Sequence, residues 1–490
     1  MNITDILTEH ARIRSSHPAI EDGERVVTYG ELDSLVDAAA ANLHVAGVGT
    51  GDIVAVLLDD SADHLIILYA LARAGAVIFS LNSNASKAEL ESSLASATVK
   101  AVITPGPRLP GADLVWLRAE DICRPAQNTF DGQSAGGGDP VMLVQSSGTT
   151  GAPKSFVRSH ADFVQWIERH ARHQGWTAAE RSVALTHMSF NVGRNVSLGM
   201  LRLGATVVIN HTRSPEELAT LVRDKRISYL QLAPSHMIPL LDHAANKAPL
   251  FPGLRAMCVG HAPTTHEQRL LARERLNLNC FEQFGANEAG LLSLALPADQ
   301  DAYPESVGRV IDGIEAQIVD DEDRPVPAGE VGQVRFRGAG YPTRYLDDAQ
   351  ATARAFRGGW FYPGDLAALN EEGYLFFKGR ADDVINNGGA KFYPIEVEIA
   401  LLAHPDVREA AVFGWPHTRF GEVAVACVVT NSRISIQDLQ TFCKQRLAGY
   451  KVPEIIEVKG ELPRNAMGKI LKRELKDTIE RTVVERQAKR

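Results

Sequence analysis

The sequence predicts an α/β fold, in which a large N-terminal domain of helix-covered parallel sheets precedes a small α+β C-terminal domain. Between about residues 52 and 285, short β-rich runs alternate with longer helical patterns. This alternation is typical of parallel sheets with helices on both faces. The chain has 490 residues, several times the usual domain size, so at least two folding units are expected.

Local signals place individual elements in the N-terminal part. Residues 62–73 have a helical pattern between two strand-like runs. Ser214 is a suitable N-cap, and Pro215 then takes the first helical position, with two acids at the positive end of the helix dipole. The strands predicted around these helices are residues 53–58, 76–81, 205–209 and 229–232.

The pattern changes towards the C-terminus. Gly338 and Gly340 lie among short runs with an antiparallel appearance, which predicts a small β-rich subdomain. The charged turn K-G-R-A-D-D at residues 378–383 follows, and the remaining residues have a compact α+β pattern with a basic tail. We therefore expect a domain boundary here, with residues 1–379 in the N-terminal domain and residues 380–490 in the C-terminal domain.

Composition excludes several classes of protein. The net charge is -9, with 51 basic and 60 acidic residues, so no field gathers nucleic acid or an anionic membrane. The five cysteines are scattered, which favours neither a disulfide framework nor a zinc site and fits a reducing cytoplasm. The N-terminus lacks the pattern of a signal peptide, and the most apolar stretch, residues 64–81, is interrupted by Arg73 and Gly75. A cytoplasmic location without membrane or nucleic-acid partners is expected.

The most informative segment is Q-S-S-G-T-T-G-A-P-K-S at residues 145–155, directly after an apolar run at residues 140–144 that predicts a buried strand. Glycines let backbone N–H groups approach phosphate oxygens, hydroxyls add donors, and a lysine offsets the charge. The spacing differs from that of the G-x-x-x-x-G-K-[ST] loop. A flexible surface loop is the alternative. The predicted phosphate-binding residues are Ser146, Ser147, Gly148, Thr149, Thr150, Gly151 and Lys154.

This segment resembles the signature of the adenylate-forming superfamily, which includes acyl- and aryl-CoA ligases, peptide-synthetase adenylation domains and luciferases. Further landmarks follow in the family's order at Phe284, Tyr362, Gly379, Gly421 and Pro463, so the resemblance covers essentially the whole chain. It implies ATP-dependent and Mg²⁺-dependent activation of a carboxylic acid as an acyl-adenylate, with release of pyrophosphate. It also implies that the C-terminal domain is mobile.

Two segments resemble the walls of the family's adenine pocket. F-G-A-N-E at residues 284–288 follows a strand predicted at residues 279–283. It looks like the aromatic-Gly-x-Thr-Glu motif, with Asn287 in place of the usual threonine. The resemblance implies that Phe284 stacks on adenine and that Glu288 helps to hold Mg²⁺, which suits an aromatic face and a hard carboxylate. A core phenylalanine and a helix N-terminal acid are the alternatives. The remaining adenine-pocket residues implied are Gly260, His261, Ala262 and Gly285, although His261 taken alone is more typical of a packing histidine.

The ribose and hinge residues are also implied by resemblance. Y-P-G-D at residues 362–365 looks like the family's T-G-D motif with Pro363 replacing threonine, and Asp365 then accepts hydrogen bonds from the ribose hydroxyls. In the hinge motif at residues 379–383, Arg380 contacts the ribose and phosphate side and Asp382 is the pivot. Without the surrounding motifs, both segments are ordinary turns or solvated linkers.

P-R-N-A-M-G-K at residues 463–469 resembles the family's segment that carries the catalytic lysine, Lys469. A cation on a loop stabilises the charge that develops when a carboxylate attacks the α-phosphate. A surface lysine in a basic tail is the alternative. Thr149 and Glu288 complete the predicted catalytic set.

The acid pocket is predicted from residues 186–195 and 232–238. Asn191 lies thirteen residues before Gly204, at the specificity position of peptide-synthetase relatives, where an amide favours an acid without an α-amine. An aryl or small organic acid is therefore expected. The predicted pocket residues are His187, Phe190, Asn191 and Ser235.

The acceptor is the least determined part of the function. CoA is the leading prediction, because Gly388 and Gly389 resemble the family's channel for pantetheine, although Glu454 is acidic where a basic residue commonly contacts CoA. A carrier protein and a non-thiol nucleophile stay open as alternatives. So does a non-catalytic adenylate-binding protein, because of Asn287 and Pro363. A homodimer is kept as an alternative to a monomer.

Overall fold

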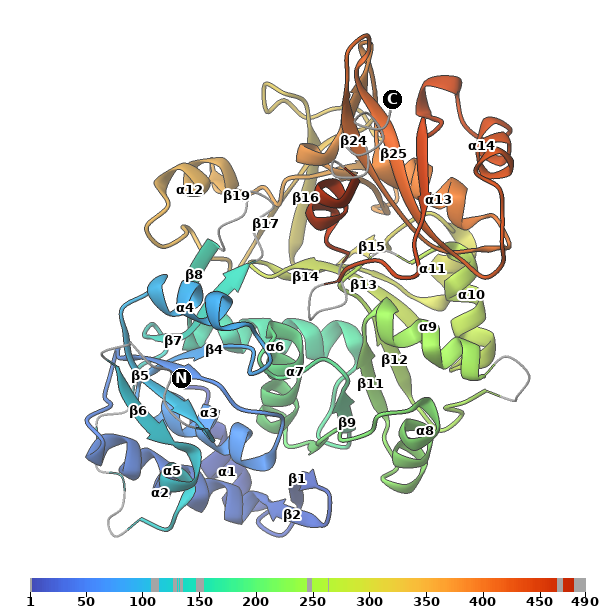
Figure 1. The fold of residues 1–490 in the computed structure, drawn as a ribbon. Helices are drawn as coiled ribbons and strands as arrows, with labels where there is room; N and C mark the ends of the chain where they lie inside the picture. Colours follow the sequence, from blue (N-terminus) through green and yellow to red (C-terminus); the bar gives the residue numbers. More distant parts are fainter. Residues whose placement is uncertain are drawn as a thin grey trace.

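The computed structural model describes residues 2–106, 114–126, 130, 132, 135–146, 154–244, 249–262, 264–464 and 470–479. Its strands form four sheets. Two of them build the large N-terminal body, and the other two lie above it as separate lobes, yellow and orange-red in Figure 1. The predicted α/β fold class is confirmed.

The nine-stranded sheet forms the centre of the body. Its strand order is β15-β14-β13-β12-β11-β9-β10-β1-β2, and the pairs from β13 to β1 are parallel, whereas both edges are antiparallel. The strands are β1 (Pro18–Asp22), β2 (Arg25–Thr28), β9 (Arg181–Ala184), β10 (Thr206–Val208), β11 (Tyr229–Leu232), β12 (Ala256–Val259), β13 (Cys280–Ala286), β14 (Gly290–Ala295) and β15 (Arg309–Val310).

A six-stranded sheet lies beside it with the order β6-β5-β3-β4-β7-β8. All neighbouring strands are parallel except β7 and β8, which form an antiparallel hairpin. The strands are β3 (Ile53–Val56), β4 (Val77–Ser80), β5 (Val99–Thr104), β6 (Val115–Arg118), β7 (Pro140–Ser146) and β8 (Lys154–Ser159).

Helices join the two sheets into one core. α3 contacts both β1 and β4, and each of its residues except Asp63 is buried, because it is covered from both sides. α6 contacts β8 and β14 in the same way. On the outer face of the nine-stranded sheet, α8, α9 and α10 cover a second apolar cluster. The helices of the body are α1 (Asp5–Ile13), α2 (Tyr29–Val45), α3 (Ala62–Arg73), α4 (Lys87–Ala95), α5 (Ala119–Cys123), α6 (His160–Gln174), α7 (Asn191–Arg202), α8 (Pro215–Asp224), α9 (Pro234–His243), α10 (His266–Arg275) and α11 (Pro297–Ala302).

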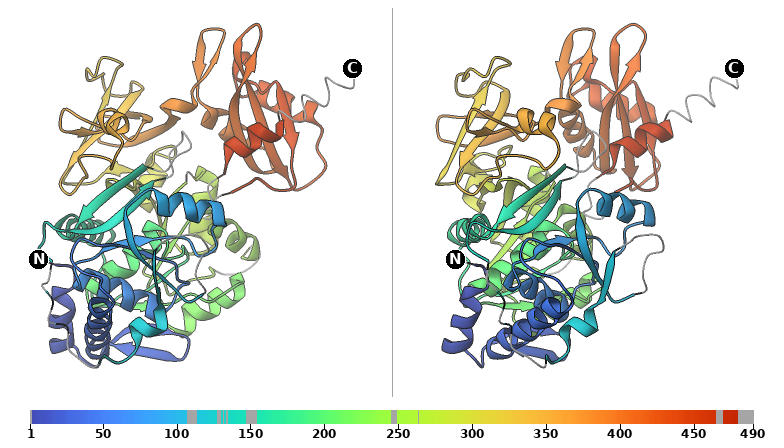
Figure 2. Two further views of the ribbon diagram at one scale, coloured as in Figure 1. Left: turned by 60° about the vertical axis from the view of Figure 1, so that its left-hand side comes forward. Right: turned by 90° about the vertical axis from the view of Figure 1, so that its left-hand side faces the viewer.

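The third sheet is antiparallel, in agreement with the predicted β-rich subdomain. The two views in Figure 2 show it as a yellow lobe above the body. Its elements are β16 (Ile314–Val319), β17 (Gly332–Gly338), β18 (Phe356–Arg357), β19 (Trp360–Phe361), β20 (Asp365–Leu369) and β21 (Leu375–Arg380), with α12 (Ala349–Ala355).

The fourth sheet belongs to the C-terminal lobe, which Figure 2 shows beside the third sheet. It has its own apolar cores, on which α13 and α14 pack. The predicted boundary after residue 379 lies one residue before the end of β21. The elements that follow are a 3₁₀ turn (Ala381–Asp383), β22 (Ile385–Asn387), β23 (Ala390–Phe392), α13 (Pro394–Leu402), β24 (Val407–His417), β25 (Gly421–Thr430), α14 (Ile436–Lys444), a second 3₁₀ turn (Gly449–Lys451) and β26 (Ile455–Val458).

The local signals of the sequence act as expected in most places. The Ser214 hydroxyl accepts from the Glu217 N–H at 3.2 Å, and Pro215 begins α8. α3 and β11 have the predicted bounds. β13 is longer than the predicted strand at residues 279–283, because antiparallel pairing with β14 carries it through Ala286.

Two bulk properties can be read from the structure. None of the helices formed by the described residues combines the length and the apolar character needed to cross a bilayer. All five cysteines are unpaired, and four of them are buried.

The tight β13–β14 hairpin depends on Gly285. A Cβ atom at this position would lie 2.2 Å from the backbone oxygen of Gly290, and a backbone atom cannot move away cheaply. We expect Gly285→Ala to destabilise the protein by about 2 kcal/mol. Gly253→Ala is the matched control, since an added Cβ there meets no atom within 4 Å. Thermal unfolding of both variants tests this, and equal melting temperatures would contradict the packing described.

Candidate active site

Parallel pairing brings the predicted pocket segments to one edge of the nine-stranded sheet. β9, β11, β12 and β13 are consecutive parallel neighbours, so their carboxyl ends lie at the same edge. In open α/β sheets, ligands bind outside these ends. The segments that leave them are residues 185–190 after β9, residues 233–235 after β11 and residues 260–262 after β12, with Phe284 near the end of β13.

Phe284 lies where this edge meets the third sheet. Its ring centroid is 5.8 Å from that of Phe377 and 6.5 Å from that of Phe336. The side chain is only partly buried, so it combines core contact with an accessible surface. The turn at residues 287–289 follows and carries Asn287 and Glu288.

Glu288 is a buried carboxylate, with 7% of the residue exposed. Its Oε1 accepts a hydrogen bond from the Tyr345 hydroxyl at 2.7 Å, and no basic group of the described residues lies within ion-pair distance. Burial and the neighbouring Glu288 carboxylate raise the pKa of Tyr345, so the phenol stays protonated and donates. A buried carboxylate that lacks an ion pair and has an oxygen left to bind a hard cation fits Mg²⁺.

Tyr345 also connects Glu288 with the phosphate-loop segment. The Lys154 ammonium lies 5.5 Å from the centre of the Tyr345 ring, which is within the range of a cation–π contact. Lys154 is the first residue of β8, and its register partner is Ser146, the last residue of β7. The ends of the phosphate segment are therefore held beside Glu288, although the two motifs are more than 130 residues apart in the sequence.

The phosphate segment joins two antiparallel strands. Ser147, Gly148, Thr149, Thr150 and Gly151 lie outside the described residues, between β7 and β8. The next helix, α6, begins only at His160, after the whole of β8. No helix N-terminus directly follows this segment, so the predicted phosphate binding would rely on backbone N–H groups, hydroxyls and Lys154.

Arg158 of β8 fixes the β13–β14 turn. Its Nη2 donates to the backbone oxygens of Asn287 at 2.9 Å and of Glu288 at 3.3 Å. Burial lowers the pKa of Arg158 to about 10, which still leaves the guanidinium charged at neutral pH. The turn is thus held from β8, the same strand that begins with Lys154.

Asp365 and Arg380 lie opposite each other on neighbouring strands of the third sheet. They are register partners on β20 and β21, and Arg380 Nη1 lies 2.7 Å from Asp365 Oδ1. Arg380 Nη1 also donates to the Pro363 oxygen at 2.8 Å. Gly364 has φ +82°, which permits the sharp turn before Asp365. Sheet register therefore brings the predicted ribose residue and the hinge arginine together, while Asp382 is exposed in the following 3₁₀ turn.

His261 occupies the turn after β12 with φ +78°, a conformation that side-chain-bearing residues rarely adopt. Burial lowers its pKa to about 4, so the imidazole is neutral at neutral pH. Its Nε2 lies 3.5 Å from Gln231 Nε2. Gly260 precedes it, and a Cβ there would meet Gln283 at 2.7 Å, while Ala262 is half-buried. A ring that binds a proton this weakly suits a packing role better than that of a catalytic base.

His187, the first of the predicted acid-pocket residues, takes part in a series of polar contacts. His187 Nδ1 is 2.7 Å from Ser189 Oγ, and His187 Nε2 is 3.2 Å from Asp60 Oδ1, which also accepts from the Met188 N–H. Burial raises the pKa of Asp60, although the nearby His187 opposes this shift. These contacts tie the segment after β9 to the loop before α3.

The other three predicted residues line the same edge. Phe190 is the N-cap residue of α7 and is half-buried. Asn191 begins α7, and its Oδ1 accepts from Arg194 Nη2 at 2.5 Å. Ser235 is half-buried in the first turn of α9, directly after the carboxyl end of β11. The amide oxygen that was expected to read the substrate therefore already has a cationic partner.

Comparison with known proteins identifies the family. The model of the AMP-binding enzyme family matches residues 7–346, and the model of the AMP-binding enzyme C-terminal domain matches residues 396–469. The chain belongs to the AMP-binding enzyme family. The predicted superfamily, and with it the prediction of an AMP-forming ligase, is confirmed.

Several relatives cover nearly the whole chain. A feruloyl-CoA synthase of Amycolatopsis sp. is 30% identical over 95% of this chain and 96% of its own length. A 2-succinylbenzoate–CoA ligase of Listeria monocytogenes is 27% identical over 97% of this chain and 99% of its own length. The structure of o-succinylbenzoate CoA synthetase from Bacillus subtilis, in complex with its acyl-adenylate intermediate, matches with a TM-score of 0.88 and 25% identity, covering 96% of this chain and 98% of that chain.

Two predicted features of this AMP-binding enzyme lie in the C-terminal lobe. Lys469 falls outside the described residues, and the residues that flank its segment, Arg464 and Ile470, form an antiparallel bridge, so residues 465–469 connect two paired positions. Gly388 and Gly389 have φ +59° and +93° and form the two-residue turn between β22 and β23. Both residues of this turn type have positive φ, which favours glycine. The backbone conformation therefore explains the two glycines without a ligand channel.

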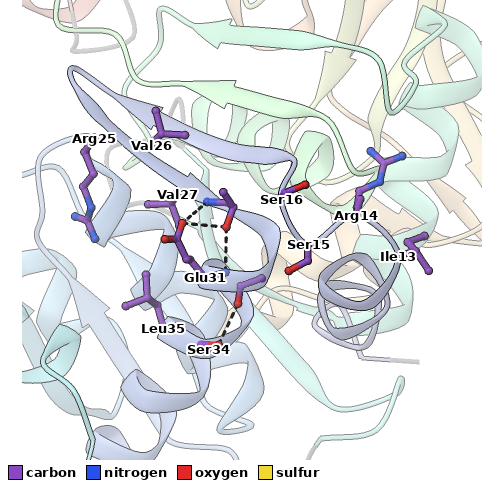
Figure 3. Close-up of a pocket in the computed structure, with 12 residues that line it drawn as sticks. Ile13, Arg14, Ser15, Ser16, Arg25, Val26, Val27, Glu31, Ser34 and Leu35 are labelled. Atoms are coloured by element: carbon purple, nitrogen blue, oxygen red, sulfur yellow. Dashed lines mark hydrogen bonds between the residues drawn. The ribbon is translucent and has the colours of Figure 1, made fainter.

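A hollow of about 830 Å³ lies elsewhere in this AMP-binding enzyme, between the end of α1, β2 and the start of α2 (Figure 3). The hydrogen bonds drawn there belong to the capping box of Thr28 and Glu31 and to the Ser34 hydroxyl, which bonds the Gly30 oxygen. No predicted site residue is among its lining residues. These bonds are part of the helix start and do not form a reaction centre.

Sequence reasoning missed three residues at the site. Tyr345 lies in the stretch before α12 and has no motif of its own. Arg158 could have been noticed as a charge within the strand-like run S-F-V-R, and Arg194 as a charge one helical turn after Asn191. Both arginines are almost fully buried.

The Tyr345–Glu288 hydrogen bond gives a test of this site. We expect Tyr345→Phe to weaken MgATP binding about tenfold, because a hydrogen bond to a charged group contributes about 1.5 kcal/mol. Tyr341→Phe is the control, because its buried hydroxyl has no hydrogen-bond partner among the described residues. Calorimetric titration measures both variants, and unchanged affinity in Tyr345→Phe would remove Glu288 from the metal site.

Proposed function

We propose that this AMP-binding enzyme activates a carboxylic acid as its acyl-adenylate, releases pyrophosphate and transfers the acyl group to CoA. ATP, Mg²⁺ and CoA are then its cofactor and co-substrates. The observation that carries the proposal is the meeting of Lys154, Tyr345 and Glu288 at the carboxyl edge of the nine-stranded sheet. A hairpin suited to phosphates and a buried carboxylate suited to a hard cation thus lie at the sheet edge from which the predicted acid-pocket segments leave.

The proposed mechanism places the triphosphate on the β7–β8 hairpin. Lys154 and Thr149 contact the phosphates there, and Glu288 would hold Mg²⁺, which offsets phosphate charge when bound. The carboxylate of the acid attacks the α-phosphorus in line, an oxygen–phosphorus bond forms, and pyrophosphate leaves. Lys469 approaches from the C-terminal lobe and stabilises the charge on the equatorial and bridging oxygens.

The nucleoside half uses the junction of the central and third sheets. Phe284 offers a partly exposed ring to adenine, and the turn at residues 260–262 forms the opposite wall. Asp365 accepts hydrogen bonds from the ribose hydroxyls while Arg380 holds its carboxylate in place. Asp365 can therefore bind the ribose while it keeps its ion pair with Arg380.

The acid is proposed to be an aryl or small organic acid without an α-amine. Relatives named feruloyl-CoA synthase and 2-succinylbenzoate–CoA ligase support this class. A further support is the Arg194 guanidinium, which lies 2.5 Å from Asn191 Oδ1 at the position where peptide-synthetase relatives hold an ammonium group. Two cations at one position repel each other, so an amino acid is disfavoured.

CoA is the proposed acceptor, because the relatives compared above are CoA ligases or synthetases. In this proposal, residues 380–490 form a C-terminal domain that turns about Asp382, withdraws Lys469 and brings Gly388 and Gly389 to the thiol channel. A carrier protein as acceptor, a homodimer and a cytoplasmic location stay predictions.

Two assays test the proposed reaction. Exchange of labelled pyrophosphate into ATP is measured with a panel of aryl and small aliphatic acids, with amino acids as the negative set. Thioester formation is then measured with and without CoA. Exchange with an aryl acid followed by a CoA thioester supports the proposal. Exchange without any thioester would move the acceptor to a carrier protein or another nucleophile, and no exchange with any acid would favour a non-catalytic adenylate-binding protein.

Lys469 provides the sharpest variant. We expect Lys469→Ala to lower the rate of pyrophosphate exchange about 100-fold to 1000-fold, since a positioned cation at the developing charge supplies several kcal/mol. Lys476→Ala is the control, because Lys476 lies in the same basic tail but contacts only the Phe413 ring within the described chain. If both variants retain full exchange activity, Lys469 is a surface residue and the catalytic assignment is wrong.

A further inference from the structure

Arg194 lies in the first turn of α7, and only 1% of the residue is exposed. Its guanidinium donates from Nη2 to Asn191 Oδ1 at 2.5 Å and from Nε to Asn195 Oδ1 at 3.3 Å. Both acceptors are neutral amides. Among the described residues, no carboxylate lies within 4.0 Å of this guanidinium.

Two other buried arginines, Arg73 and Arg269, have carboxylate partners, whereas Arg158 bonds backbone oxygens and has no ion pair among the described residues. Arg73 pairs with Asp33 and Asp37, both at 2.6 Å, and Arg269 pairs with Glu282 at 2.6 Å. Burial of an unpaired charge is strongly unfavourable, and amide oxygens offset only part of that cost. Burial, together with the nearby Arg158 guanidinium, lowers the pKa of Arg194 to about 9. Arg194 therefore lacks a negative charge that the fold supplies elsewhere.

The surroundings of Arg194 contain further polar groups without partners. The Thr186 hydroxyl is buried and has no hydrogen-bond partner among the described residues. Neither ring nitrogen of the buried His64 has a well-aligned partner there, although the Asp59 backbone lies close enough to act on the ring. Burial lowers the pKa of His64 to about 3, and the nearby His187 and Arg194 add to this shift, so the ring is neutral and one nitrogen can donate. The first turn of α7 packs on residues 186 and 187, since a Cβ on Gly193 would lie 2.0 Å from the Thr186 oxygen.

Such a group of unsatisfied donors indicates an absent acceptor. The donors come from α3, the segment after β9 and α7. The His64 ring centroid lies 6.4 Å from that of the predicted pocket residue His187, and Gly193 of α7 packs on Thr186. The phosphate hairpin and Lys154 belong to β7 and β8 and are already assigned to the triphosphate. An anion that reaches Arg194 would therefore arrive with the acid.

We propose that the acid activated by this enzyme carries a second anionic group, best met by a second carboxylate, and that this group pairs with Arg194. The inference rests on the proposed function, because it takes residues 186–195 as the acid pocket. The planar guanidinium can bind both oxygens of a carboxylate, while Asn191 and Asn195 hold it in place. His64 and Thr186 supply the remaining donors. Arg194 is thus a specificity residue, and the reacting carboxylate lies at the other end of the acid.

The test compares matched acids in pyrophosphate exchange. Benzene-1,3-dicarboxylate and benzene-1,4-dicarboxylate are each paired with the half-amide, in which one carboxylate is replaced by a neutral amide of the same shape. Butanedioate and its half-amide form an aliphatic pair. For at least one pair, we expect the wild-type kcat/KM of the diacid to exceed that of the half-amide about 100-fold, as for a buried charge pair that loses one partner.

Arg194→Gln is expected to abolish this preference, whereas Arg194→Lys retains part of it because the charge is kept. Arg223→Gln is the control, since Arg223 lies exposed on α8. This variant should prefer the diacid over the half-amide as strongly as the wild type does. The KM for ATP is measured in parallel. If Arg194→Gln fails to fold in a melting experiment, the wild-type comparison of diacid and half-amide decides alone.

Three outcomes are distinguishable. Equal or better use of the half-amides by the wild type would overturn the inference while leaving the proposed function intact. A raised KM for ATP in Arg194→Gln, with all acids affected alike, would assign Arg194 to the triphosphate and also overturn it. Absence of exchange with every acid tested would instead refute the proposed function, and the inference with it.

Discussion

Parallel pairing of β9, β11, β12 and β13 is the constraint on which the site depends. It places four chain segments from a stretch of about one hundred residues at one edge of a sheet. This edge of the sheet alone would not select a particular ligand. The β7–β8 hairpin of the second sheet adds the phosphate segment, and α3 and α6, packed between the sheets, fix the relative position of the two. Specific chemistry at this edge is thus a consequence of core packing.

Charge distribution separates the site from the rest of the molecule. Away from it, buried charges are compensated, as in the pairs Arg269–Glu282 and Arg73–Asp33. At the site, Glu288, Arg158 and Arg194 are buried without an ion-pair partner among the described residues, although Arg158 donates to two backbone oxygens. Uncompensated charges cost stability, and proteins retain them where a ligand supplies the missing partner. These buried charges are the basis for the proposals that Glu288 binds a cation and that Arg194 binds an anion.

The sequence predicted much of this architecture, because its signals are local. The capping pattern at Ser214 and the apolar runs around α3 determine those elements without reference to the rest of the chain. The phosphate segment could be recognised because its glycines, hydroxyls and lysine are contiguous. Local signals also explain the error in the length of β13, since its extension depends on pairing with β14.

Contacts that depend on tertiary structure could not be predicted. Tyr345 reaches Glu288 from a segment 57 residues further along the chain, and no local pattern marks that contact. The pairing of Asp365 with Arg380 follows from the register of β20 and β21, which the two motifs do not specify. The pocket role of Asn191 stays a prediction, and the sequence did not indicate its cationic partner, because Arg194 reaches its side chain only once α7 has formed. Burial, which makes Arg194 unusual, is likewise a property of the whole fold.

The central claim is that the β7–β8 hairpin, Glu288 and the edge of the nine-stranded sheet form one nucleotide site. A crystal structure of the protein with ATP and Mg²⁺ tests it most directly. The account predicts phosphates between Lys154 and Glu288, with adenine against Phe284. Nucleotide bound in the hollow beside α1 and β2, or phosphates remote from Glu288, would contradict it.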